Sequence, residues 1–274
     1  AVGSRGIRGI DRLARSLVDG LKALGAKPFI VPAMGSHGGA TADGQRDLLA
    51  RYGVSEDALG VPVMSSMATT VIAETAGGVP IHFSSEALAA HRVEPLARVK
   101  PHTDFRGRVE SGLCKMLAIG LAKHAGCSRL HREGFARFVE LLPEVASRVI
   151  EHTKVGFGIA VVENAYDETA LVEAVPAADF LRRDAELLVQ AKRLMARIML
   201  PAIDVLVVER IGKDISGAGM DPNIMGRTVK GPLEGYDGPD IKRIVVLGLT
   251  EATHGNAIGI GAAAFLPCDE RLAL

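Results

Sequence analysis

The chain has 274 residues, enough for one large or two medium domains with a sizeable buried core. Hydrophobic residues make up 48% and charged residues 23%, as in an ordinary globular protein, and 32 basic side chains balance 32 acidic ones. This balance excludes a global basic field for nucleic acid, and the absence of Trp argues against base-stacking surfaces.

Cysteine usage and hydropathy bear on the compartment. Cys114, Cys127 and Cys268 form no CxxC motif, and an odd, sparse count fits a reducing cytoplasm. We see no apolar run of 18 residues and no signal peptide. We therefore expect a cytoplasmic protein that binds neither membranes nor nucleic acid. Because the chain does not begin with Met, we also expect residues upstream of Ala1.

Hydrophobic periodicity predicts alternating helices and strands in the first half of the chain. Apolar residues at helical spacing mark 9–26 and 41–54, and the short apolar run 27–33 between them reads as a buried strand. Another strand is predicted at 77–84. The segment 111–126 reads as a helix that ends at its last residue, a glycine.

The second half continues the alternation. We predict helices at 135–153 and 177–200 and strands at 156–164, 202–211 and 241–250. The longer helix bridges two halves, so we place a domain boundary near residue 190, giving domains 1–190 and 191–274, the second incomplete. Alternation of this kind favours an α/β fold with mostly parallel sheets.

The stretch "MGSHGGAT" (34–41) follows the predicted strand 27–33 and contains His37. Ligands of α/β sheets bind at the carboxyl ends of strands, and Gly38 and Gly39 let a ligand approach the backbone. The alternative is an ordinary histidine of a surface loop.

A dense polar stretch, "RVKPHTDFRGRVESGLCKML", contains His102 after a proline that fixes the approach of the chain. Lys115 lies near the first turn of a predicted helix, where it either reaches water or points into a cleft. His131 follows 16 residues later, roughly 24 Å away along a straight helix. The two can share a site only if the chain turns, and Gly126 offers a turning point.

A long loop, "GKDISGAGMDPNIMGRTVKG" (212–231), separates the last two predicted strands and carries Arg227 and Lys230. Loops of this length in compact domains are usually functional or disordered. No HExxH, cysteine cluster or GxSxG motif is present. Three histidines on separate loops also suit a catalytic zinc site, so a zinc-dependent hydrolase is one alternative function.

Taken in order, these motifs resemble those of the nickel-pincer lactate racemases, the LarA-like family. "MGSHGGAT" and "KPHTDF" resemble the segments with the two catalytic histidines, and "SGLCKML" resembles the segment with the cofactor-tethering lysine. His131 falls at the spacing of the nickel ligand. "GSR", with Arg5, and "MDPNIMGRTVKG" resemble the segments that carry substrate-binding cations.

The resemblance implies two α/β domains with a cofactor cleft between them. The cofactor is a pyridinium mononucleotide with two sulfur donors that holds Ni(II), supplied by cofactor-biosynthesis proteins. The implied activity is racemisation or epimerisation of a 2-hydroxy acid by transient hydride transfer. The roles implied are: His37 and His102, catalytic bases; Lys115, Gly38, Gly39 and Ser111, cofactor contacts; His131, nickel ligand; Arg5, Lys230 and Arg227, substrate contacts.

Two departures from the family pattern lead to a further alternative. Lys115 lies 13 residues after His102, a longer spacing than in the lactate enzymes, and Met225 stands where they have an aromatic residue. We therefore also consider a non-catalytic protein that binds the nickel-pincer cofactor or a metal.

Overall fold

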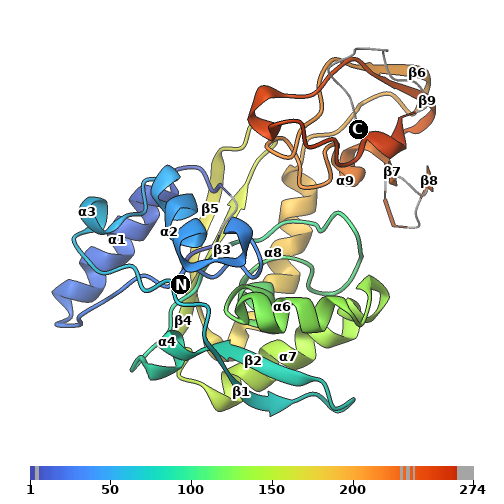
Figure 1. Ribbon diagram of the computed structural model, residues 1–274. Coiled ribbons are helices and arrows are strands. Elements are labelled where there is room, and N and C mark those ends of the chain that lie inside the picture. Colours follow the sequence, from blue (N-terminus) through green and yellow to red (C-terminus); the bar gives the residue numbers. More distant parts are fainter. Residues whose placement is uncertain (4–5, 229–230, 233–234, 237, 264–274) are drawn as a thin grey trace. The chain divides into compact units, whose positions relative to one another are not determined.

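The computed structural model describes residues 1–274 except 4–5, 229–230, 233–234, 237 and 264–274 (Figure 1). It divides into two compact units. Unit 1 comprises Ala1–Pro101 and Phe105–Met195, and unit 2 comprises His102–Asp104 and Ala196–Leu274. Two clusters of buried apolar side chains lie in unit 1 and one lies in unit 2, so each unit has its own core.

The long helices of unit 1 are amphipathic and bury one face. They confirm the four helices predicted at 9–26, 41–54, 135–153 and 177–200. In α1, for example, Ile10, Ala14 and Val18 recur at helical spacing and are buried. The helices of unit 1, apart from the segment around Lys115, are α1 (Ile10–Ala23), α2 (Ala42–Arg51), α3 (Glu56–Leu59), α4 (Ser85–Ala89), α7 (Phe138–His152) and α8 (Phe180–Leu194).

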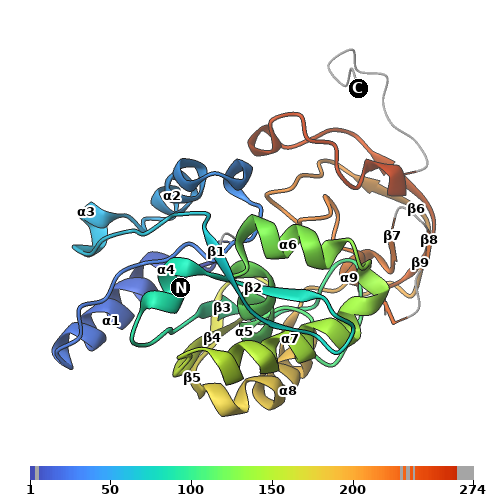
Figure 2. The same ribbon diagram turned by 60° about the horizontal axis from the view of Figure 1, so that its bottom comes forward.

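Unit 1 contains a three-stranded sheet and a separate hairpin. In the sheet, β4 (Phe157–Glu163) lies between β3 (Leu96–Arg98), which is parallel to it, and β5 (Thr169–Pro176), which is antiparallel. The hairpin joins β1 (Thr69–Glu74) to β2 (Pro80–Ser84), and helices α6 (Lys123–His131) and α7 pack against it (Figure 2). The predicted strands at 77–84 and 156–164 are therefore confirmed.

Two sequence predictions in unit 1 are corrected. The run 27–33 makes only isolated bridges, Val2 with Pro32 and Ile30 with Val63, because prolines remove backbone donors from it. The helix predicted at 111–126 is broken into α5 (Leu113–Lys115), a π-helical turn (Met116–Gly120) and α6 (Lys123–His131).

Gly126 does not end a helix, because α6 runs through it to His131. A side chain at Gly126 would place its Cβ 2.9 Å from the Cβ of His82 on β2. The glycine therefore lets α6 pack closely on the hairpin, and the chain turns before α6 instead. Lys123 takes a left-handed backbone conformation there, with φ 53°.

Unit 2 is built on two parallel strands, β6 (Ala202–Val208) and β9 (Asp240–Val246), as predicted at 202–211 and 241–250. The long loop between them holds α9 (Pro222–Met225) and a short antiparallel pair, β7 (Arg227–Thr228) with β8 (Gly231–Pro232). The chain thus has the α/β class predicted, with parallel and antiparallel pairings. Along the described residues, no helix has the length and apolar character needed to cross a membrane.

Candidate active site

The loop that bears His37 depends on left-handed backbone at several positions. Gly35, Gly38 and Gly39 have φ values of 57°, 64° and 65°. A side chain at Gly38 would place its Cβ 2.6 Å from the backbone of Gly44, so the loop lies tightly against the first turn of α2. Gly39 instead meets open space, and the side chain of His37 is exposed. The loop therefore presents His37 to solvent from a closely packed base.

Gln45, which sequence reasoning missed, stabilises this loop through its side-chain amide. Its side chain is fully buried, and Nε2 donates to the carbonyl oxygens of Gly35 at 2.9 Å and His37 at 3.3 Å. Oε1 has no hydrogen-bond partner among the described residues. Gln45 occupies a buried helical position four residues before Leu49, and a polar residue in that apolar stripe is the sequence signal that marks it.

His131 lies at the end of α6, with its ring oriented by three neighbours. Nδ1 donates to the carbonyl oxygen of Cys127 at 2.7 Å. The rings of Phe135 and Phe138 meet the imidazole edge-on, with centroids 5.6 and 5.1 Å away. Because Nδ1 carries the proton, Nε2 keeps the lone pair that a metal ligand needs. The residue as a whole is exposed.

Cys127 connects His131 to the His37 loop. Its Sγ lies 3.5 Å from His131 Nδ1 and 3.9 Å from Ser36 Oγ. The hydrogen bond with Cys127 raises the pKa of His131, against burial and the positive charge of Lys115. Burial tends to raise the pKa of the thiol, but its bonds with His131 and Ser36 outweigh this and lower it. These contacts tie α6 to the loop beside it.

Lys115 belongs to the same neighbourhood of unit 1. It is half-buried at the end of α5, and its charge is one of the influences on His131. Ser111, also half-buried, comes shortly before α5. The charge of Lys115 therefore acts on His131 although the two residues are 16 positions apart in the sequence, with the turn before α6 between them.

A buried carboxylate caps the segment that carries Lys115. Asp184 on α8 accepts the backbone N–H of Leu113 at 3.2 Å and of Cys114 at 2.7 Å. Sequence reasoning missed this residue as well. Its signal is that Asp184 falls on the apolar stripe of α8, between Phe180 and Leu187, where a charged side chain is unexpected.

His102 lies in unit 2, not in the unit that carries His37. Its Nδ1 accepts the backbone N–H of Asp104 at 3.1 Å, and the side-chain amide of Asn223 donates to its carbonyl oxygen at 3.1 Å. These contacts fix the turn after Pro101 to the loop of α9. The imidazole is mostly buried, with its side chain 12% exposed.

Arg227 is the predicted substrate-binding cation that the structure describes, because Arg5 and Lys230 lie outside the described residues. Its Nη1 donates to the carbonyl oxygen of Ile241 at 3.1 Å. Arg227 lines a hollow of about 180 Å³ within unit 2, together with Asp104, Met225 and Thr228. Met225 is a core residue of unit 2 as well as part of this wall.

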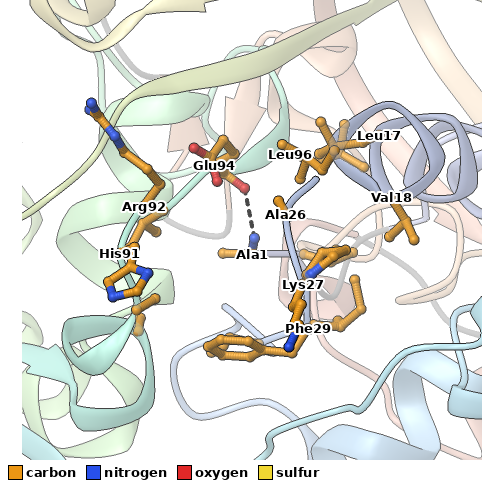
Figure 3. Close-up of a pocket in the computed structure, with 18 of the residues that line it drawn as sticks. Ala1, Leu17, Val18, Ala26, Lys27, Phe29, His91, Arg92, Glu94 and Leu96 are labelled. Carbon is orange, nitrogen blue, oxygen red and sulfur yellow. Dashed lines mark hydrogen bonds between the residues drawn. The ribbon is translucent and has the colours of Figure 1, made fainter. Parts of the chain in front are cut away.

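A second hollow, of about 650 Å³, lies in unit 1 and is distinct from the predicted site (Figure 3). Lys27, Phe29, His91 and Glu94 contribute to its wall, and the amine of Ala1 donates to the backbone oxygen of Glu94 at 2.7 Å. Its lining residues include none of the predicted site residues. Over the described part of the chain, no three His, Cys, Asp or Glu side chains form a group able to hold a metal ion.

Known structures share this fold, although no family model and no curated protein sequence matches the chain. The fold is of the lactate-racemase type. A Thermotoga maritima protein from structural genomics matches with a TM-score of 0.65 and 14% identity, over 90% of this chain and 64% of its own. The lactate racemase apoprotein from Thermoanaerobacterium thermosaccharolyticum matches with a TM-score of 0.53 and 13% identity, over 90% and 60%. The chain thus spans less than two thirds of either protein.

Proposed function

We propose that this chain is a racemase or epimerase of a 2-hydroxy acid that uses a nickel-pincer nucleotide. The observation that carries the proposal lies in unit 1 of a chain with the lactate-racemase fold. There Cys127 contacts both His131 and the loop of His37, and the charge of Lys115 acts on His131. A tether, a metal ligand and a base therefore belong to one neighbourhood.

The residues fit such a cofactor. A pincer would bring donors of its own, so the chain would have to add one neutral imidazole, a ligand that suits Ni(II). His131 is an exposed residue, and the bond from its Nδ1 to the carbonyl oxygen of Cys127 sets the ring tautomer that leaves Nε2 as the ligand atom. Lys115 is the amine for the tether, with Ser111, Gly38 and Gly39 as further contacts. When bound, the cofactor supplies a reversible hydride acceptor for the substrate carbon.

The chain's own residues handle the proton and the carboxylate. Loss of a hydride from carbon and a proton from the hydroxyl leaves a planar 2-keto acid. The two enantiomers present that hydroxyl differently, so two bases are needed, and His37 and His102 serve as this pair. An ordinary imidazole pKa near 6.5 suits both directions of transfer. Arg227, with Arg5 and Lys230, holds the carboxylate and so fixes the substrate carbon.

Co-expression with the cofactor-making enzymes tests the proposal. Native mass spectrometry should find one nickel-pincer unit per chain, and chiral chromatography should show interconversion of a 2-hydroxy acid. His37→Ala and His102→Ala should each keep nickel but lower the rate by roughly 10²-fold or more. His131→Ala should lose nickel. His124→Ala is the matched control, because His124 is an exposed histidine on the same helix and bonds Ser128.

The outcomes separate the alternatives. Chains without nickel or pincer mass from a competent host would overturn the proposal. Chains that bind the cofactor but racemise no 2-hydroxy acid would be carriers of it. Stoichiometric zinc with chelator-sensitive hydrolysis would indicate a zinc-dependent hydrolase. The proposal places the protein in the cytoplasm, with cofactor-biosynthesis proteins as partners.

A further inference from the structure

We propose that Asp184 is a positioning residue for Lys115, because its carboxylate on α8 caps α5 and so fixes where the amine is presented. The inference rests on the role that the proposed function gives to Lys115. It concerns a residue that touches neither the cofactor nor the substrate and acts through the backbone of its neighbours.

The cap is specific in its geometry. Each carboxylate oxygen takes one backbone donor: Oδ1 lies 3.2 Å from the nitrogen of Leu113 and Oδ2 lies 2.7 Å from that of Cys114. These are backbone donors at the start of a helix, which have no partner within the helix. Gly112 has φ 147°, and a Cβ there would lie 2.7 Å from Oδ1. Gly112 thus permits the close approach of the carboxylate.

Helix α8 holds this segment at a second point. Lys192, two turns further along α8, donates to Oε1 of the buried Glu110 at 2.8 Å. Glu110 in turn accepts the backbone N–H of Gly107 at 3.3 Å. The chain from Gly107 to Cys114 is therefore fixed to one helix by two carboxylates. Lys115 follows Cys114 directly, so its Cα lies one peptide, about 3.8 Å, beyond the capped residue.

The carboxylate is buried and matched to the two donors that it accepts. Asp184 is 1% exposed, and burial raises its pKa to about 6, against the bonds from Cys114 and Leu113. At neutral pH the ionised form is thus kept in the core at a desolvation cost that these bonds offset, and an apolar residue in its place would leave both buried backbone donors without an acceptor. The nearest titratable group that bears on it is the Cys114 thiol, whose pKa is raised by burial and by Asp184 itself. Only the ionised carboxylate accepts both donors fully.

The test compares Asp184→Asn with the wild type and with Glu186→Gln as control. Glu186 is an exposed carboxylate on the same helix that bonds Arg182 and Arg183. The rate of amide hydrogen exchange at Leu113 and Cys114 reports whether their backbone N–H groups stay bonded to the carboxylate. Acylation of Lys115 by a limiting amount of acetic anhydride, relative to the exposed Lys27, reports presentation of the amine. Neither readout needs the cofactor.

In Asp184→Asn we expect exchange of both amides to accelerate about tenfold or more, which matches the loss of one charge-assisted hydrogen bond. The acylation ratio should change several-fold, and Glu186→Gln should match the wild type in both. Unchanged exchange of the two amides, or an unchanged acylation ratio, in folded Asp184→Asn would overturn the inference.

Failure of the inference differs from failure of the proposed function. If the cap and the acylation behave as expected but no nickel-pincer cofactor ever binds, Asp184 still positions Lys115 and the racemase proposal falls. If the wild type and Asp184→Asn take up and tether the cofactor to the same extent after co-expression, the racemase proposal stands and Asp184 has no positioning role.

Discussion

Gln45 shows how one buried side chain prepares a loop for chemistry. The loop of His37 is exposed and turns through left-handed conformations, one of them at Ala40 with φ 56°, which is unfavourable for a residue with a Cβ. The Gln45 amide supplies two donors to carbonyl oxygens on either side of Ser36. Its orientation is fixed by chemistry, because an amide turned over would set Oε1 against those two acceptors. Gln45 therefore orients the base without contacting a substrate.

Replacement of Gln45 separates this support from simple packing. Gln45→Met keeps the volume but removes the side-chain donor to the carbonyl oxygens of Gly35 and His37, of which the second keeps a backbone donor from Ala40. We therefore expect a loss of about 1–3 kcal/mol in the free energy of unfolding. Gln45→Glu should cost more near neutral pH and recover in acid, where the protonated carboxyl donates again. Urea unfolding at pH 5 and 8 measures both. Asp47→Asn, on the exposed side of the same helix, should change little. Equal stability of Gln45→Glu at the two pH values would contradict this account.

At the scale of elements, amphipathic helices were predictable and the break near Lys115 was not. Periodicity identifies α1, α2, α7 and α8 because each buries one face. The helix end predicted at Gly126 was wrong because a glycine can either end a helix or allow close packing in the middle of one. At Gly126 the neighbouring strand β2, which the local sequence does not reveal, requires close packing. The short β3 pairs for three residues, too few for a pattern to register.

The sequence points to some residues of the candidate site and not to others. Motif resemblance proposes His37, Lys115 and His131, because their side chains would perform the chemistry, and their roles stay predictions. It does not propose Gln45 and Asp184, because each acts on a backbone segment distant in sequence or on the far side of a loop. Nothing in local composition links Asp184 to Cys114, 70 residues earlier.

The turn before α6 places the ammonium group of Lys123 in the core, and the free-energy cost of burying that charge depends on pH. Lys123 is fully buried and donates from Nζ to the carbonyl oxygen of Pro32 at 2.8 Å. Burial lowers its pKa from 10.5 to about 8, against the attraction of Glu86. Between those values the unfolded chain binds more protons than the folded one, so stability rises with pH over that window.

Lys123→Met should remove that dependence. Relative to the variant, the wild type should gain roughly 3 kcal/mol between about pH 8 and 10.5, since each pKa unit corresponds to about 1.4 kcal/mol. Urea unfolding of both proteins at pH 7.5 and 10.5 gives the difference. Lys27→Met, an exposed position, should keep the wild-type slope. Parallel pH profiles for the wild type and Lys123→Met would mean that the buried amine keeps its ordinary pKa and stays protonated across this range, which would contradict the expected cost of burying it.

For the whole molecule, the two units differ in how much core each contains. Among the residues that the structure describes, both larger apolar clusters belong to unit 1, while the cluster of unit 2 centres on six buried residues. Residues 196–201 join α8 to β6 without regular secondary structure along most of their length, and Met199 is 87% exposed. The proposed roles are also divided, with His37, Lys115 and His131 in unit 1 and His102 and Arg227 in unit 2.

We therefore expect residues 1–195 to fold without the rest of the chain. The fragment retains both apolar clusters, the α8 cap on α5 and the bonds of His131, which all lie within unit 1. It should melt cooperatively, and Leu113 and Cys114 should keep their amide protection. It should not racemise a 2-hydroxy acid, because Arg227 and the loop that fixes His102 are missing. Circular dichroism melting with amide exchange tests the first part, and limited trypsin digestion should cut the full chain early at Arg197. A fragment that melts without a cooperative transition would show that unit 1 depends on unit 2 for its core.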